Sequence, residues 1–179
     1  MQEMIIKRVK ELLSEEKGDR VLAWEAGESA YDRTPAVYTA ENIDSLKYDS
    51  LCGCNLISES AKDAKVIALI KPCDSYSLNQ LLTEHRVNRE KVYVLAVGCR
   101  GKIDVEKIRA MGIRGITGIE ENGDRLTVHT LYGDHEIARA DALLTKCLSC
   151  KGKEHKIADE TIGESEDTTV GGRFDMVEK

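Results

Sequence analysis

The stretch that decides the fold is Val66-Ile67-Ala68-Leu69-Ile70-Lys71-Pro72-Cys73-Asp74. Its first five residues are all apolar, which is typical of a strand covered on both faces of a sheet. A Pro-Cys pair ends this run, and a helical pattern follows to about Glu84, with Asp74 or Ser75 expected as its cap. The proline fixes the local backbone, and the positive end of the helix favours the thiolate form of the cysteine beside it.

A second apolar run, residues 92–97, ends in the same way, in Gly98-Cys99-Arg100-Gly101. Because a helix separates the two runs, the chain is expected to cross over and set the two strands parallel. Sites in open α/β sheets lie at the carboxyl ends of strands, where Cys73 and Cys99 both occur. We therefore expect these two cysteines to contribute to one site.

Outside this core, the patterns predict further helices and strands. The expected elements are a helix over 4–13, strands over 20–25 and 35–38, a helix from Asp104 to 111, and a β-hairpin of 115–120 and 125–130 around Asn122-Gly123. The fold class is therefore α/β: a small, mainly parallel sheet with flanking helices, plus a β-hairpin and a cysteine-bearing C-terminal loop. Residues 1–162 are expected to form a single α/β domain, and residues 163–179 an acidic, Gly-containing tail or linker.

A third cysteine segment, Cys147-Leu148-Ser149-Cys150, has the spacing that lets two sulfurs bind one metal centre. Cys73 and Cys99 complete a set of four, and four thiolates suit either a structural zinc ion or an iron–sulfur cluster. Taken singly, Cys73 or Cys99 could equally be a small core residue. A thioredoxin-like dithiol fits the pair less well, because Lys151-Gly152-Lys153 is a poor start for a helix.

The remaining cysteines and the histidines are interpreted as structural. Cys52-Gly53-Cys54 is too closely spaced for the usual cluster ligands, and we interpret it as a loop with one buried and one exposed thiol. The histidines show no zinc-like spacing with the cysteines; they are His85, His129, His135 and His155. The sequence contains no Walker loop, Gly-x-Gly-x-x-Gly motif or serine-nucleophile motif.

Composition narrows the class of protein. The 179 residues suffice for one domain with a real core, and an aromatic content of 4% makes that core aliphatic. A formal net charge of -6 argues against a nucleic-acid partner, and no apolar run approaches the ~20 residues of a membrane span. The amino terminus lacks a signal-peptide pattern, so a cytoplasmic location is expected. Six cysteines in that compartment favour metal ligands or redox groups over structural disulfides.

Together these segments resemble the coenzyme F-420 hydrogenase/dehydrogenase beta-subunit family. The resemblance is carried, in order, by Lys71-Pro72-Cys73-Asp74, Val97-Gly98-Cys99-Arg100-Gly101, the strand pair around Asn122-Gly123, Cys147-Leu148-Ser149-Cys150, and Ala158-Asp159-Glu160-Thr161-Ile162-Gly163-Glu164. It covers roughly residues 52–164. It implies that the ligands of a 4Fe-4S cluster are Cys73, Cys99, Cys147 and Cys150, and that residues 1–162 form an iron–sulfur domain.

The resemblance also implies an oxidoreductase role. Members of the family typically carry a flavin too, and pass electrons between a nicotinamide or deazaflavin and a partner hydrogenase, formate dehydrogenase or heterodisulfide-reductase-like complex. This chain would then be a non-autonomous electron-transfer subunit of anaerobic metabolism, with other redox subunits as partners, including a ferredoxin-like or heterodisulfide-reductase-like protein. The sequence departs from longer relatives by stopping at Lys179, before their ferredoxin-like segment, and by lacking their glycine-rich flavin-binding stretch. FAD is therefore left open.

Two other classes of function remain open on the residues alone. The same four thiolates could hold zinc in a structural adaptor, which would be colourless. Alternatively, Cys52-Gly53-Cys54-Asn55 could line the flavin pocket of a subunit that acts on a small redox substrate.

Overall fold

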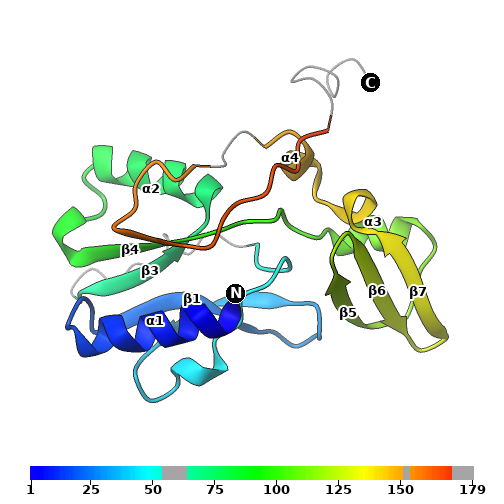
Figure 1. Ribbon diagram of the computed structural model, residues 1–179, viewed down its shortest axis with the longest axis horizontal. Coiled ribbons are helices and arrows are strands. Elements are labelled where there is room, and N and C mark those ends of the chain that lie inside the picture. Colours follow the sequence, from blue (N-terminus) through cyan, green and yellow to red (C-terminus); the bar gives the residue numbers. More distant parts are fainter. Residues whose placement is uncertain (54–63, 151–153, 171–179) are drawn as a thin grey trace.

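The computed structural model describes residues 1–53, 64–150 and 154–170, and these ranges form two sheets (Figure 1). The larger sheet has the strand order β2-β1-β3-β4-β8, and the smaller sheet has the order β5-β6-β7. The larger sheet consists of β1 (Arg20–Ala26), β2 (Arg33–Tyr38), β3 (Val66–Ile70), β4 (Val92–Val97) and β8 (Glu160–Ile162). The smaller sheet consists of β5 (Ile116–Asn122), β6 (Arg125–Thr130) and β7 (Gly133–Ala138).

Helices of very different lengths accompany these strands. The α-helices are α1 (Gln2–Ser14), α2 (Pro72–Thr83), α3 (Val105–Ala110) and α4 (Thr145–Leu148). Short 3-10 helices are η1 (Ile43–Ser45), η3 (Arg89–Lys91) and η4 (Arg139–Ala142). Within the described part of the chain, every helix is too short or too polar to cross a lipid bilayer.

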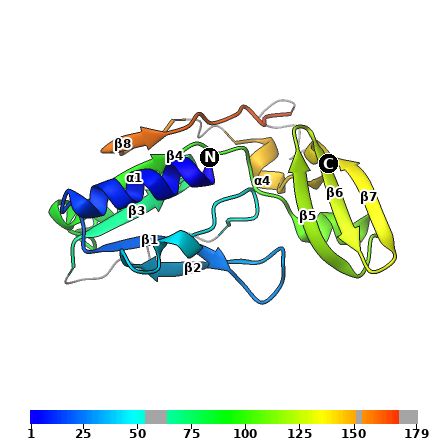
Figure 2. The same cartoon turned by 60° about the horizontal axis from the view of Figure 1, so that its bottom comes forward.

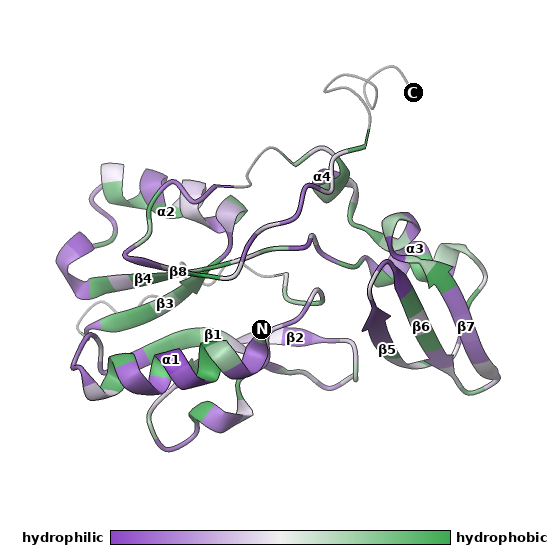
Figure 3. Cartoon of the chain, viewed as in Figure 1, coloured by the Kyte–Doolittle hydropathy of each residue, from purple (hydrophilic) through white to green (hydrophobic). Residues whose placement is uncertain are grey.

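The larger sheet is mainly parallel, as the sequence predicts. β3 is parallel to both β1 and β4, and only the β1–β2 pair is antiparallel. Ile67 and Leu69 pack in the same core cluster as the apolar side of α1, whereas Ala68 and Ile70 pack with Leu78 of α2. Figures 1 and 3 show the two helices on opposite faces of a sheet whose central strands are hydrophobic. Burial on both faces explains why the β3 run is apolar at every position.

The smaller sheet contains the predicted hairpin and one further strand. β5 and β6 pair antiparallel around a turn in which Gly123 has a φ of +64°, a conformation that favours glycine. β7 then pairs with β6 and completes a three-stranded meander. Almost every β7 residue is exposed, so the strand carries no apolar alternation that a sequence reading could detect. Figure 2 shows the smaller sheet beside one end of the larger one.

Besides β7, two local features differ from the sequence prediction. The helix α2 begins at Pro72 with Lys71 as its N-cap, because proline is well accommodated at the first helical position, so the predicted caps Asp74 and Ser75 lie inside the helix. The short strand β8 was not predicted, and it adds to the sheet parallel to β4. The sequence also has a short helical pattern over residues 55–61, which lie outside the described residues. The proposed boundary between a domain and a tail at residue 163 stays a prediction.

Candidate functional site

Four cysteines from three separate segments line one cavity of about 80 Å³. They are the four that the sequence singles out: Cys73, Cys99, Cys147 and Cys150. The first is exposed to solvent, the other three are half-buried, and all four are free thiols. The rest of the wall consists of Pro72, Gly101, Lys146, Ser165, Glu166 and Thr168. The fold thus brings all four cysteines around one cavity, while their role as ligands stays a prediction.

The larger sheet presents two of these cysteines. β3 ends at Ile70, and Cys73 lies in the first turn of the helix that follows. β4 ends at Val97, and Cys99 comes two residues later. Because β3 and β4 are adjacent and parallel, both cysteines lie at the same edge of the sheet, where sites of α/β proteins form.

The other two cysteines lie in and just after the short helix α4. Cys147 is the third residue of this helix, and Cys150 follows its end, where its N–H donates to the Cys147 carbonyl at 3.3 Å. The N–H of Leu144 donates to the carbonyl of Lys102 at 2.8 Å. This bond joins the start of α4 to the chain that leaves Cys99, and so brings the cysteine pair to the sheet edge.

Two backbone amides point at sulfur atoms of the site. The Gly101 N–H donates to Sγ of Cys99 at 3.3 Å, and the Lys102 N–H donates to Sγ of Cys147 at 3.3 Å. Gly101 has a φ of +83°, and a Cβ at this position would lie 3.0 Å from the Leu143 side chain. A glycine is therefore required for the turn that supplies these donors. Such donors stabilise negative charge on sulfur.

The surroundings of the two sheet-borne cysteines, Cys73 and Cys99, favour the protonated thiol. Desolvation at the cavity wall raises the pKa of the Cys73 thiol to about 11 even though the residue as a whole is exposed, with the Asp74 carboxylate adding to the rise and Lys71 opposing it. Burial also raises the pKa of Cys99, and the hydrogen bond from the Gly101 amide opposes that rise. Because a thiolate is the form that binds metal, binding would release these protons.

The lining of this cavity supplies four thiols and one carboxylate, that of Glu166, as metal donors. No described histidine lines the cavity. Among residues 1–53, 64–150 and 154–170, no three cysteine, histidine, aspartate or glutamate side chains are already placed as the ligands of a single metal ion. Thiols from three segments are therefore the main donor set of the site.

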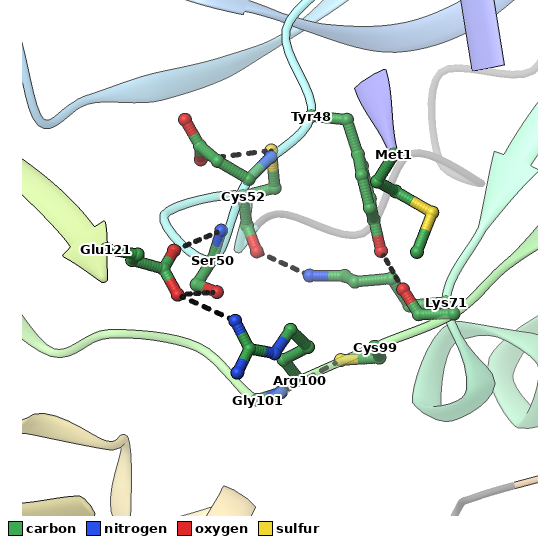
Figure 4. Close-up of a pocket in the computed structure, with 11 residues that line it drawn as sticks. Met1, Tyr48, Ser50, Cys52, Lys71, Cys99, Arg100, Gly101 and Glu121 are labelled. Atoms are coloured by element: carbon green, nitrogen blue, oxygen red, sulfur yellow. Dashed lines mark hydrogen bonds and ion pairs between the residues drawn. The ribbon is translucent and has the colours of Figure 1, made fainter. Parts of the chain in front are cut away.

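A second cavity, of about 190 Å³, shares Cys99 and Gly101 with the first. Figure 4 shows Tyr48 on one side of it and Glu121 on the other. The Tyr48 hydroxyl donates to the carbonyl of Gly98 at 2.6 Å, directly before the cysteine. A ligand in this cavity would lie against the same turn that bounds the cysteine cavity.

A buried lysine fixes a positive charge beside the sheet-borne cysteines. Lys71 is 6% exposed, and its ammonium donates to the carbonyl of Cys52 (Figure 4). The same ammonium lies 5.3 Å from the centroid of the Trp24 ring, a cation–π contact. These two contacts hold the charge in place between the core and the site.

Cys52 lies in the hydrophobic core and lines the second cavity, not the cysteine cavity (Figure 4). Burial raises the pKa of its thiol to about 12. A buried thiol of this kind is typically an inert core residue, in agreement with the interpretation of one buried thiol in this loop. Cys54, the other thiol of this loop, lies outside the described residues.

A buried arginine joins the smaller sheet to the chain after Cys99. The guanidinium of Arg139 donates to the carboxylate of Glu121 at 3.0 Å, to the hydroxyl of Ser50 at 3.1 Å, and to the carbonyl of Arg100. The position of the turn after Cys99 therefore depends on the smaller sheet. Sequence reasoning missed this residue, because the segment around it has no clear apolar period.

Sequence reasoning also missed one wall of the cysteine cavity. Ser165, Glu166 and Thr168 line it, and they come from the segment predicted to be a tail. Acidic residues and glycines without an apolar period indicate exposed chain, and a segment held by hydrogen bonds leaves no periodic pattern. One sequence signal pointed to this segment: the family resemblance continues to Glu164, directly before the residues that line the cavity.

Comparisons with known proteins agree with that resemblance. No family model matches the sequence. Over 173 residues the chain is 24% identical to the F420-dependent formate dehydrogenase subunit beta of Methanocaldococcus jannaschii. This match covers 86% of the present chain and 46% of that protein. Over 91 residues it is 30% identical to the F420-dependent formate dehydrogenase 1 subunit beta of Methanococcus maripaludis, covering 48% of this chain and 23% of that protein.

Among solved structures, a chain of the F420-reducing NiFe hydrogenase complex from Methanosarcina barkeri has a similar fold. The TM-score is 0.63 at 14% sequence identity, over 82% of this chain and 58% of that chain. The present chain thus spans about half the length, or less, of the curated relatives that it matches. The sequence matches and the shared fold support, at low sequence identity, the coenzyme F-420 hydrogenase/dehydrogenase beta-subunit family as the family of this chain.

Proposed function

We propose that this chain is an electron-transfer subunit of an F420-dependent hydrogenase or formate dehydrogenase, and that it relays electrons through one 4Fe-4S cluster. The observation that carries the proposal is the single cavity lined by four thiols from three segments. The ligands of the cluster would be Cys73, Cys99, Cys147 and Cys150. The named relatives support the type of complex, and its other redox subunits would be the partners.

The residues around the cavity fit a cluster of this kind. A 4Fe-4S cluster takes four cysteine thiolates and supplies a centre that accepts and releases one electron at a time. The amides of Gly101 and Lys102 already donate to two of the sulfurs, and the Lys71 charge lies close by. Donors and positive charge near the sulfurs favour the more negative, reduced form, so these groups raise the reduction potential.

A zinc-stabilised adaptor would use the same four thiols, because zinc also binds four cysteine ligands. The likeness to subunits named for formate dehydrogenase and hydrogenase complexes supports a redox centre over a structural zinc ion. Iron and zinc analysis of the purified chain separates the two.

A flavin is a second candidate ligand, and the cavity beside Cys99 is the observation that favours it. That cavity shares a wall with the cysteine site, so a flavin ring there would be close enough for electron exchange. Its volume of about 190 Å³ is below the roughly 300–1,000 Å³ of typical ligand pockets. The described residues would therefore enclose only part of such a molecule, and FAD extraction tests whether it binds.

The test is anaerobic preparation of the chain, with iron and sulfide analysis and visible and EPR spectra. We expect about four irons per chain, a brown colour, and loss of most of the iron in Cys147→Ser. Cys52→Ser is the matched control, because the Cys52 thiol lies outside the cysteine cavity. This variant should leave the iron content unchanged. Stoichiometric zinc in a colourless protein, or full iron retention in Cys147→Ser, would contradict the proposal.

A further inference from the structure

The chain after β8 crosses the cysteine site before it leaves the described structure. Residues 163–170, which we name the strap, run from the edge of the larger sheet to α4 (Figures 1 and 2). Directly before it, the carbonyl of Ile162, the last residue of β8, accepts from the N–H of Gly98 at 2.8 Å. At its end, the N–H of Val170 donates to the carbonyl of Leu148 at 2.8 Å. The strap is therefore attached on both sides of the cavity.

Between these two ends, the strap binds the main chain of Cys99 on both sides. The hydroxyl of Ser165 accepts from the Cys99 N–H at 3.1 Å. The N–H of Glu166 donates to the Cys99 carbonyl at 2.9 Å. With both its peptide groups bound, Cys99 is held in one backbone orientation. The turn through Gly101, whose amide donates to the Cys99 sulfur, begins from that orientation.

The strap also binds the main chain of the cysteine pair. The hydroxyl of Thr168 donates to the carbonyl of Cys147 at 2.6 Å. The hydroxyl of Thr169 donates to the carbonyl of Cys150 at 3.0 Å. Three of the four cysteines are thus contacted through their backbones by residues within five positions of one another.

These contacts are made by a segment that contributes little to the hydrophobic core. Ser165 and Thr168 are half-buried, and the rest of the strap is exposed, including Val170 at 65%. No strap residue belongs to a described core cluster. The approach is nevertheless close, because a Cβ on Gly98 would lie 2.4 Å from the carbonyl oxygen of Glu164. Hydrogen bonds and shape at the cysteine site hold the strap, rather than apolar burial.

We propose that Ser165 and Thr168 are positioning residues for the metal centre. Their hydroxyls fix the backbones of Cys99 and Cys147, so that both sulfurs face the cavity and receive the amides of Gly101 and Lys102. Both side chains also line the cavity, so the strap covers the centre on this side. This inference rests on the proposed function and goes beyond it, because it assigns a role to residues that are not ligands.

The inference predicts effects on both retention and potential of the centre. Removing the hydroxyls frees the two cysteine backbones, so the double variant Ser165→Ala/Thr168→Val should lose iron to a ferrous chelator about tenfold faster than the wild type. Displaced amides donate less well to the sulfurs, and the reduction potential should therefore fall. The single variant Thr168→Ser keeps the hydroxyl, so its rate of iron release and its reduction potential should lie close to those of the wild type.

The experiment uses the anaerobically prepared full chain, with iron release followed by absorbance and the potential measured by an EPR-monitored titration. The control double variant Ser45→Ala/Thr83→Val removes two hydroxyl-to-carbonyl bonds, to Asn42 and Asn79, away from the cavity. Equal iron release and potential in the two double variants would overturn the inference. Faster release with an unchanged potential, or no rescue by Thr168→Ser, would also overturn it, since either indicates general loosening. A wild-type chain that binds no iron would instead refute the proposed function itself.

Discussion

Replacing Arg139 with methionine tests whether the smaller sheet fixes the turn after Cys99. The Arg139 side chain is 5% exposed and its partner Glu121 is 21% exposed, so their ion pair is largely shielded from water. The same guanidinium also binds the hydroxyl of Ser50 and the carbonyl of Arg100. Methionine keeps a long apolar side chain but removes every one of these donors.

The expected loss of stability follows from what remains after the substitution. Breaking a buried ion pair by removing one partner typically costs about 3–5 kcal/mol. Glu121 would keep the Ser50 hydroxyl at 2.9 Å, the Ser50 N–H at 3.3 Å and the guanidinium of Arg100 at 3.9 Å, and it reaches some solvent. We therefore expect the lower end of that range, about 3 kcal/mol, in the free energy of unfolding of Arg139→Met.

Urea unfolding under anaerobic conditions, followed by circular dichroism, measures this change. Arg125→Met is the matched control, because its pair with Glu136 lies on the same sheet at 3.1 Å but with both side chains more than 60% exposed, at 63% and 64%. It should cost less than about 1 kcal/mol. Adding Glu121→Gln to Arg139→Met should recover part of the loss, since it removes a partly buried carboxylate that keeps only the more distant charge of Arg100. Equal losses in the two arginine variants would refute the reasoning.

Three further predictions concern the strap, the buried lysine and β8. Gly98→Ala should destabilise the chain by about 1–3 kcal/mol and lower its iron content, because the new Cβ meets the Glu164 backbone; unchanged iron and unfolding midpoint would contradict this. Lys71→Met should lower the reduction potential in an EPR titration by removing a nearby positive charge, and an unchanged or higher potential would count against that effect. The hydrogen bond from Arg8 holds the pKa of Glu160 below its ordinary value of 4.5, so this contribution to stability is complete above pH 4.5 and is lost as the pH falls through the lowered value. Glu160→Gln should remove that part of the pH dependence of unfolding between neutral and acidic pH, and identical profiles for the two proteins would exclude the role.

The sequence predicts the larger sheet well, because burial of its central strands requires a local run of apolar residues. A run buried on both faces must be apolar throughout, and Val66–Ile70 is such a run. The crossover then sets β3 and β4 side by side, and the positions of Cys73 and Cys99 follow from the ends of those strands. The turn through Gly123 was equally predictable, since Asn-Gly between two strand-like runs is a strong hairpin signal.

The parts that could not be predicted are held by polar contacts between distant segments. β8 has three residues, and its place beside β4 depends on backbone pairing that no side-chain period records. Arg139 lies in a segment of mixed pattern, yet it binds groups from two other parts of the chain. Ser165 and Thr168 looked like parts of a solvated tail for the same reason. Hydrogen bonds can join any two polar positions, so the sequence does not indicate which ones meet.

The buried sheet and the segments held by polar contacts support different cysteines of the site. Cys73 is held by the core itself, because its helix begins directly after a fully buried strand. Cys147 and Cys150 have less of this support, since α4 is a short helix with no buried residue and meets the core through the partly buried Leu148. Their position depends on the bond between Leu144 and Lys102 and on the strap. Two cysteines of the site thus lie at the edge of a rigid sheet, and the other two are held beside them by hydrogen bonds. For that reason, residues that are not ligands can control how firmly a metal centre is held.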